Sequence, residues 1–356
     1  MIILGIETSC DETAVSIIEA QGDLKSLGFK YLGSAINSQI KIHSEYGGVV
    51  PNIAKREHTK NLPIILEEAL RSTGLKDLKS IDLIAVTVGP GLEPALWTGI
   101  IFAKELSEKW NIPMVPTNHM DGHIVSVLLN KTEESSVRKI EFPILALLIS
   151  GGHTEFIFLK SWTEKEKIGQ TQDDAVGEAF DKVARMLGLP YPGGPEISNL
   201  AEIARTKNIV LENKFPRPML HSKDLNFSFS GLKTSVLYYL KNLTSISDQT
   251  KLAVAREFED AVIETLISKT QKALQKTEAK TLIIGGGVIA NKALRENFLK
   301  LKETYSQNYG EIEIIIPEKS LTTDNATMIA AAGFIEYLRD RKPNQNFKAE
   351  GNLEVS

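Results

Sequence analysis

Apolar segments and short polar segments follow one another along the chain in a pattern that predicts two β-hairpins. Residues 2–18 and residues 144–159 each contain an apolar strand, a short loop rich in Ser, Thr and Gly, and a second apolar strand. A tight polar loop between two apolar runs is typical of a hairpin. Because the pattern occurs twice, about half a chain apart, it predicts a duplicated lobe with a cleft between the halves.

Strands and helices alternate through the rest of the chain. Apolar runs and apolar residues at helical spacing predict further elements over 82–88, 95–110, 173–187, 254–266, 281–291 and 323–338. Asp173 and Asp174 are expected to cap the helix that follows them. Residues 226–229 alternate Phe and Ser, which predicts a strand with a buried Phe face; stacking on RNA is the alternative.

Composition favours a soluble protein of two lobes. The length of 356 residues exceeds twice the ~150 residues of an average domain. The longest apolar run, residues 144–149, is far shorter than the ~20 residues of a membrane span. With 42% apolar and 24% charged residues, the chain is neither disordered nor fibrous.

Charge and cysteine content indicate the compartment and limit the partners. The formal net charge of −4 gives no global attraction to nucleic acid, so a polyanion needs a local patch or another subunit. The single cysteine, Cys10, fits a reducing compartment. The first residues have the features of neither a secretory signal nor a transit peptide, so we expect a cytoplasmic protein.

Two histidines four residues apart form the first candidate site. His119 and His123 would lie on one face of a helix, a spacing that suits a shared metal ion. A zinc protease would carry Glu directly after the first His, where this chain has Met120. Asp324 is a possible third ligand, although an Asp in this position is more commonly a helix cap.

Three glycine-rich loops form the second candidate site. They comprise residues 150–153, Gly193-Gly194 and residues 285–287, and each could let backbone N–H groups approach a phosphate or nucleoside. None has the sequence of a Walker loop, but three such loops together favour nucleotide binding.

Two groups of charged residues remain ambiguous. The acidic loop from Glu7 to Glu12 could hold a metal or orient a substrate, or could simply cap a turn. Glu178, Asp181 and Arg185 share one helix face, which by itself indicates a solvated surface with an ion pair.

Eleven segments together resemble one family, the universal Kae/TsaD/Qri family (formerly Gcp), in its bacterial tRNA threonylcarbamoyladenosine transferase branch. The segments are LGIETSCDET at 4–13, HSEYGGVVP at 43–51, GPGL at 89–92, NHMDGH at 118–123, LLISGGHT at 147–154, GEAFDKVARMLGLPYPGGP at 177–195, FPRPM at 215–219, FSFSGLKT at 227–234, EFEDAV at 257–262, GGGVIAN at 285–291 and TDNATMIA at 323–330.

The resemblance implies an α/β fold of the actin/Hsp70/sugar-kinase class, with two lobes, a duplicated β-sheet core and a nucleotide cleft between the lobes. We expect an N-terminal lobe over 1–135, a C-terminal lobe over 136–322, a helix over 323–340 that returns to the first lobe, and a flexible tail over 341–356.

The resemblance also implies the site residues. His119, His123 and Asp324 become ligands of one divalent metal ion, iron(II) or alternatively zinc(II). The residues expected to contact threonylcarbamoyl-adenylate are Leu148, Ile149, Ser150, Gly151, Gly152, Asp181, Gly194 and Asn291, with Asp181 holding the ribose hydroxyls. Asp11 and Glu12 are candidates to accept the amine proton.

The implied reaction transfers the threonylcarbamoyl group to N6 of the adenosine beside the anticodon of tRNA, forming t6A and releasing AMP. The implied partners are TsaB-like and TsaE-like proteins, with the adenylate supplied by a TsaC-type enzyme. A nucleotide-binding scaffold without catalytic activity is the alternative. The chain departs from the family pattern at Glu93, Pro94 and Trp97, and at Asn118 and Asp121 beside the histidines.

Overall fold

The chain folds into two compact units. The computed structural model describes residues 1–74, 80–129, 136–137, 140–340 and 347–355. Unit 1 comprises residues 1–140, 162–164 and 317–356, and unit 2 comprises residues 141–161 and 165–316. The main boundaries lie after residues 140 and 316, whereas the sequence predicted them after residues 135 and 322. No helix in the described part is long and apolar enough to cross a membrane.

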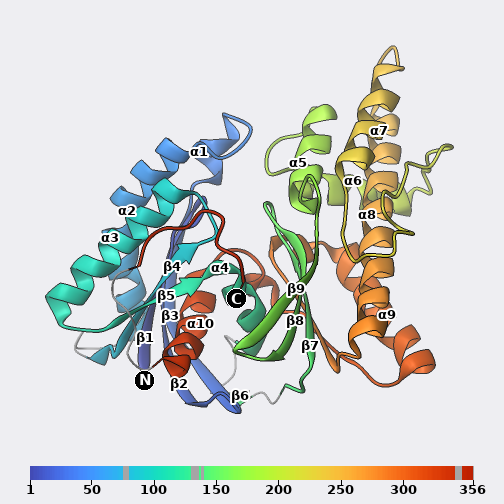
Figure 1. Ribbon diagram of the computed structural model, residues 1–356. Helices are drawn as coiled ribbons and strands as arrows, with labels where there is room; N and C mark the ends of the chain where they lie inside the picture. The colour runs from blue at the N-terminus through green and yellow to red at the C-terminus, as the bar shows by residue number, and fades with distance from the viewer. Residues whose placement is uncertain (75–79, 130–135, 138–139, 341–346, 356) are drawn as a thin grey trace. The chain divides into compact units, whose positions relative to one another are not determined.

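Unit 1 contains a six-stranded sheet and five α-helices among its described residues (Figure 1). The strands are β1 (Ile2–Glu7), β2 (Glu12–Asp23), β3 (Ser26–Ser38), β4 (Leu83–Gly89), β5 (Met114–Asn118) and β6 (Ser136–Val137). The helices are α1 (Ile40–Ser44), α2 (Pro51–Thr73), α3 (Glu93–Trp110), α4 (His119–Val125) and α10 (Ala326–Arg339).

Unit 2 contains a five-stranded sheet and, in its described part, five α-helices. The strands are β7 (Ile144–Ile149), β8 (Thr154–Ser161), β9 (Glu164–Gln170), β10 (Thr281–Gly285) and β11 (Glu313–Ile315). The helices are α5 (Val176–Met186), α6 (Gly193–Thr206), α7 (Ser230–Lys241), α8 (Asp248–Thr277) and α9 (Lys292–Tyr309).

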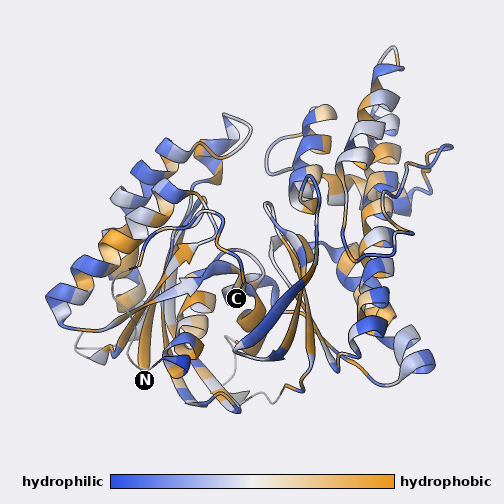
Figure 2. Cartoon of the chain, viewed as in Figure 1, coloured by the Kyte–Doolittle hydropathy of each residue, from blue (hydrophilic) through white to orange (hydrophobic). Residues whose placement is uncertain are grey.

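The two sheets share one strand order, which confirms the predicted duplication. The orders are β5-β4-β1-β2-β3-β6 in unit 1 and β11-β10-β7-β8-β9 in unit 2. In each sheet the first three strands run parallel, and the hairpin partner β2 or β8 is antiparallel to the third. Central strands such as β1 and β7 are mainly hydrophobic, whereas the edge strand β9 is hydrophilic (Figure 2), which protects an exposed edge from further pairing.

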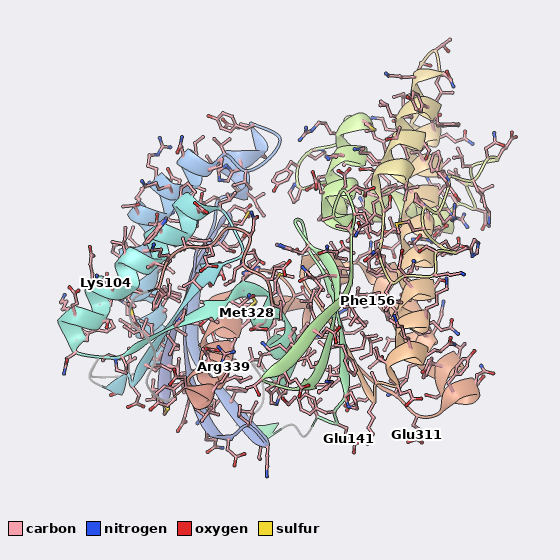
Figure 3. The ribbon with its side chains drawn as sticks, in the orientation of Figure 1. Lys104, Glu141, Phe156, Glu311, Met328 and Arg339 are labelled. Carbon is pink, nitrogen blue, oxygen red and sulfur yellow. The ribbon has the colours of Figure 1, made fainter. Side chains whose placement is uncertain are left out.

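Each sheet has its own apolar core. In unit 1, Leu4 and Ile6 of β1 belong to a buried cluster with residues of α2 and α3. In unit 2, Phe156 of β8, labelled in Figure 3, packs against Phe227 with 5.0 Å between ring centroids. The apolar residues of each hairpin therefore pack into the core of their own unit.

Two local predictions in unit 2 are wrong. Asp173 and Asp174 do not cap α5, whose N-cap is Ala175. Asp173 instead accepts hydrogen bonds from the backbone N–H groups of Phe229 and Ser230 at the start of α7. Residues 226–229 form no strand but a single bridge between Thr171 and Phe227. The Phe side chains are buried as predicted, and this burial excludes the alternative of RNA stacking.

The expected flexible tail does not hold for residues 347–355. Phe347 and Leu353 pack against the apolar cluster of unit 1. The N–H of Glu350 donates to the carbonyl of Val88 at 2.8 Å, and the N–H of Gly91 donates to the carbonyl of Gly351 at 3.0 Å. The polar composition of the tail gave no sign of these hydrogen bonds, because they are formed by backbone atoms. Residues 341–346 and 356 lie outside the described part.

Candidate metal centre and nucleotide-binding loops

Helix α4 places both histidines on one face at the end of strand β5. Asn118 caps this helix, because its Oδ1 accepts a hydrogen bond from the N–H of Met120 at 2.8 Å. His119 and His123 are both buried, and their rings meet edge to face with centroids 4.8 Å apart. The departure from the family pattern at Asn118 thus supplies a helix cap.

Helix α10 brings Asp324 to the same place. A Cβ on Gly122 would stand 3.0 Å from side-chain atoms of both Met328 and Ile329, so the glycine allows α4 and α10 to pack closely. Met328 is labelled on α10 in Figure 3. The cap of α10 is Asn325, whose Oδ1 accepts from the N–H of Met328 at 3.0 Å. Asp324 is therefore not the cap.

The three side chains fit a divalent metal ion. Asp324 Oδ1 lies 3.4 Å from His119 Nε2 and 3.2 Å from His123 Nε2, and one ligand atom from each residue lies within 4.8 Å of the others. Neither ring nitrogen of the buried His123 has a hydrogen bond of acceptable geometry within the described residues. Two imidazoles and a carboxylate are a common ligand set for divalent transition metals.

Glu7, which the sequence analysis named only as the start of an ambiguous acidic loop, supports this centre. It ends β1, is fully buried, and its Oε2 lies 3.0 Å from His119 Nδ1 and 2.7 Å from Thr87 Oγ1. Its Oε1 accepts from the N–H of Ser9 at 2.5 Å. A carboxylate beside Nδ1 keeps the proton there and leaves Nε2 as the metal-binding nitrogen. In the sequence, this role of Glu7 is indicated by a carboxylate that stands directly at the end of an apolar strand.

The charged groups of the centre shift one another's pKa values. Burial alone would raise the pKa of Asp324, but His119 and His123 hold it far below its usual range. Burial alone would lower the pKa of His119, but Asp324 and Glu7 raise it well above its ordinary value. Burial lowers the pKa of His123. A metal ion therefore competes with a proton on His119 and not with one on His123.

Asp11 and Glu12 occupy the loop between β1 and β2 in the same unit. Glu12 is the first residue of β2, and its Oε1 accepts a hydrogen bond from Ser38 Oγ at 3.1 Å. Burial, reinforced by the charge of Asp11, raises the pKa of Glu12 to about 10. This shift favours the neutral form of the Glu12 carboxyl.

All the predicted adenylate contacts lie in unit 2: residues 148–152 end strand β7 and begin the turn after it, Asp181 lies on α5, Gly194 on α6, and Asn291 caps α9. The Ser150 turn is closed by a 2.8 Å bond from its N–H to the carbonyl of His153. The N–H of Gly177, on α5, donates to the carbonyl of Ser150 at 3.2 Å. Gly286 has φ +95°, and a Cβ there would lie 2.3 Å from the carbonyl oxygen of Ile149. Strand ends of this kind are the usual ligand position in open α/β sheets.

Two of the predicted contacts, Asp181 and Asn291, have side chains that already form hydrogen bonds within the protein. Asp181 Oδ1 accepts from the N–H of Gly193 at 2.7 Å, which fixes the start of α6. Asn291 Oδ1 caps α9, and its Nδ2 donates to Glu259 at 2.5 Å and to Ser198 at 3.2 Å.

Of the remaining predicted contacts, Ser150 accepts a hydrogen bond through Oγ from the N–H of His153 at 3.0 Å, and the others have buried side chains or none. The side chains of Leu148 and Ile149 are fully buried. A Cβ on Gly151, Gly152 or Gly194 would meet no heavy atom of the described residues within 4 Å. The backbone at these glycines therefore borders open space, which a ligand could approach closely.

The repeated sheet order and the fold comparison define the class of protein. The structure resembles the crystal structure of T. kodakarensis HypF with a TM-score of 0.59, over 95% of this chain and 48% of that chain. At 12% sequence identity this likeness concerns the fold alone. The chain has the two-sheet α/β fold of the actin/Hsp70/sugar-kinase class, with a His-His-Asp centre in unit 1.

Sequence comparisons identify the family within this class. Residues 30–331 match the family described as TsaD, tRNA N6-adenosine threonylcarbamoyltransferase. A protein of that name from Thermosipho melanesiensis is 46% identical over the full length of both chains. One from Bacillus subtilis is 42% identical over 100% of this chain and 96% of its own. The chain belongs to this transferase family, which confirms the resemblance found in its motifs.

Proposed function

We propose that this chain transfers the threonylcarbamoyl group from threonylcarbamoyl-adenylate to N6 of adenosine 37 in tRNAs that read codons beginning with A. The product is t6A, and AMP is released. Membership of the transferase family supports the reaction. The observation that carries the proposal is the convergence of His119, His123 and Asp324, with Glu7 in place to orient His119.

His119 Nε2, His123 Nε2 and a carboxylate oxygen of Asp324 would hold the metal, which we take to be iron(II), with zinc(II) as the alternative. A bound divalent ion would supply Lewis-acid polarisation of a coordinated oxygen. The chain's own contribution is to keep His119 in one tautomer through Glu7 and to bury the ligands.

The loops of unit 2 would bind the adenylate. The backbone N–H groups of Gly151 and Gly152 would be donors for oxygens that gain negative charge during transfer, whereas the N–H of Ser150 already donates to the carbonyl of His153. Leu148 and Ile149 would contribute through backbone atoms, since their side chains are buried. Gly194 and the Asn291 loop would bind the adenosine, and the carboxylate of Asp181 would accept hydrogen bonds from the ribose hydroxyls.

Asp11 is the better candidate for the base, because burial raises the pKa of Glu12 and favours its neutral form, which cannot accept a proton. In the proposed step, a bond forms between N6 and the carbamoyl carbon, and the bond from that carbon to the phosphate oxygen breaks. AMP leaves with the electron pair, and the N6 proton passes to Asp11. The carboxyl of Glu12 can donate a hydrogen bond to the developing charge.

We propose that the reaction takes place in the cytoplasm and requires partner proteins. The net charge of −4 favours capture of tRNA by an assembly rather than by this chain alone. TsaB-like and TsaE-like proteins would complete the assembly, and a TsaC-type enzyme would supply the adenylate.

The test uses two transcripts of one tRNA that differ only at position 37, adenosine in one and guanosine in the other. The protein and its partners are incubated with threonylcarbamoyl-adenylate, and the nucleosides are identified by mass spectrometry. The proposal expects t6A only in the adenosine transcript. Modification of both transcripts, or of neither while the adenylate remains intact, would contradict it.

A further inference from the structure

Unit 1 contains a run of buried polar side chains to which the proposed function assigns no role. Gln39 precedes α1, His43 lies on α1, and His58 lies on α2. All three side chains are at most 1% exposed. They form an unbroken hydrogen-bonded series between two backbone groups, the N–H of Val50 and the carbonyl of Cys10.

The two backbone ends fix the direction of every bond in the series. The N–H of Val50 can only donate, so His43 Nδ1, at 3.3 Å, is an acceptor and His43 carries its proton on Nε2. That Nε2 donates to Gln39 Oε1 at 3.1 Å. Gln39 Nε2 then donates to His58 Nδ1 at 3.3 Å.

The other end requires the same direction. The carbonyl of Cys10 can only accept, so His58 Nε2, at 3.1 Å, must carry the proton. Thr13 Oγ1, 2.8 Å from His58 Nδ1, is then a second donor to that nitrogen. Both histidines are neutral in this arrangement, and burial lowers the pKa of His58, which agrees with it.

The series ends on the loop that carries Asp11 and Glu12. His58 donates to the carbonyl of Cys10, and the N–H of Gln39 donates to the carbonyl of Asp11 at 2.9 Å. Two successive carbonyls are therefore held by members of one network directly before Glu12. Ser38, the residue before Gln39, binds the Glu12 carboxyl.

We infer that His58 is a positioning residue: its Nε2–H, oriented through Gln39 and His43, fixes the Cys10 carbonyl and thereby the carboxyl groups of Asp11 and Glu12. The hydrogen-bonded series is independent of the proposed function, whereas its effect on the transfer rate rests on it.

The direction of the series is tested first. The chain has six histidines, so selective ¹⁵N labelling of histidine gives an NMR spectrum simple enough to assign with His→Gln variants. His43 and His58 are expected as neutral Nε2–H tautomers. An Nδ1–H tautomer or an imidazolium at His58 would overturn the inference.

A matched pair of variants tests the consequence. His58→Gln places an amide donor near the position of Nε2 and can still reach the Cys10 carbonyl. His58→Asn keeps an acceptor near Nδ1 for Thr13 and Gln39 but loses that donor. A small displacement of reacting groups can lower a rate by about 10²-fold. We expect a single-turnover transfer rate roughly tenfold or more below wild type for Asn, with Gln retaining most of the rate.

Cobalt(II) affinity and thermal unfolding of the two variants separate positioning from a general structural role. The metal affinity of both variants should stay near that of the wild type. The start of this loop keeps its own hydrogen bonds, because the N–H of Ser9 donates to Glu7 and the carbonyl of Ser9 accepts from the N–H of Leu92. Equal transfer rates in the two variants would overturn the inference. If the wild type transfers nothing, the proposed function is wrong. The inference about the hydrogen-bonded series is then tested only by the tautomers of His43 and His58.

Discussion

Replacing Glu7 by Gln tests the link between strand β1 and the candidate metal centre. The carboxylate of Glu7 accepts from three donors: His119 Nδ1, Thr87 Oγ1 and the N–H of Ser9. Glutamine has one carbonyl oxygen and one NH₂ group, so it cannot accept on both sides. If its NH₂ group faces His119, the imidazole proton is driven to Nε2, the nitrogen that a metal needs.

The structure gives the expected size of the effect. Glu7 is fully buried, so water cannot replace the lost acceptor. Loss of a carboxylate that orients a metal-binding histidine costs roughly 10- to 100-fold in affinity, equivalent to about 1.4–2.8 kcal/mol. Thermal stability should also fall, because one buried donor is left without an acceptor.

The assay is titration of metal-free protein with cobalt(II) in competition with a chelator. Glu257→Gln is the matched control, because Glu257 is a buried carboxylate of unit 2 that accepts from Arg217 and from the N–H of Phe215. The control should bind cobalt as the wild type does. An unchanged dissociation constant for Glu7→Gln would refute the role that we assign to Glu7.

Three further changes test other parts of the account. Asp11→Asn should lower the single-turnover transfer rate about 10²–10⁴-fold if Asp11 is the base, and an unchanged rate would exclude that role. Asn291→Ala should lower the free energy of unfolding by about 1 kcal/mol, since α9 loses its cap; equal stability in denaturant titrations would contradict this. Although burial opposes it, Asp324 and Glu7 raise the pKa of His119, so metal uptake should release a proton. Apparent cobalt affinity should then rise about tenfold per pH unit below that pKa, and a flat profile would contradict the assignment.

Short-range patterns in the sequence predicted the fold well. Apolar runs on either side of a short polar loop marked both hairpins, and the repetition of this pattern predicted the two related sheets that the structure contains. The four-residue spacing of His119 and His123 predicted a shared helix face, because helix geometry alone determines it.

The sequence was less informative where several partners compete for one side chain. Asp173 precedes α5 but binds the start of α7, 55 or more residues away in the chain. Asp324 resembled a helix cap until the structure placed Asn325 in that role. Glu7 meets His119 because β4 pairs with both β1 and β5, a contact that no local pattern reveals.

The most direct test of the central claim is transfer of labelled threonylcarbamoyl from its adenylate to unmodified tRNA, with purified partners, by wild type and by His119→Ala. The account predicts labelled tRNA and AMP with the wild type, and loss of both with the variant, while the variant still binds AMP through unit 2. Equal labelling by the two proteins would contradict the role of the metal centre. No labelling by either, despite AMP binding, would favour a scaffold that binds nucleotide without catalysing transfer.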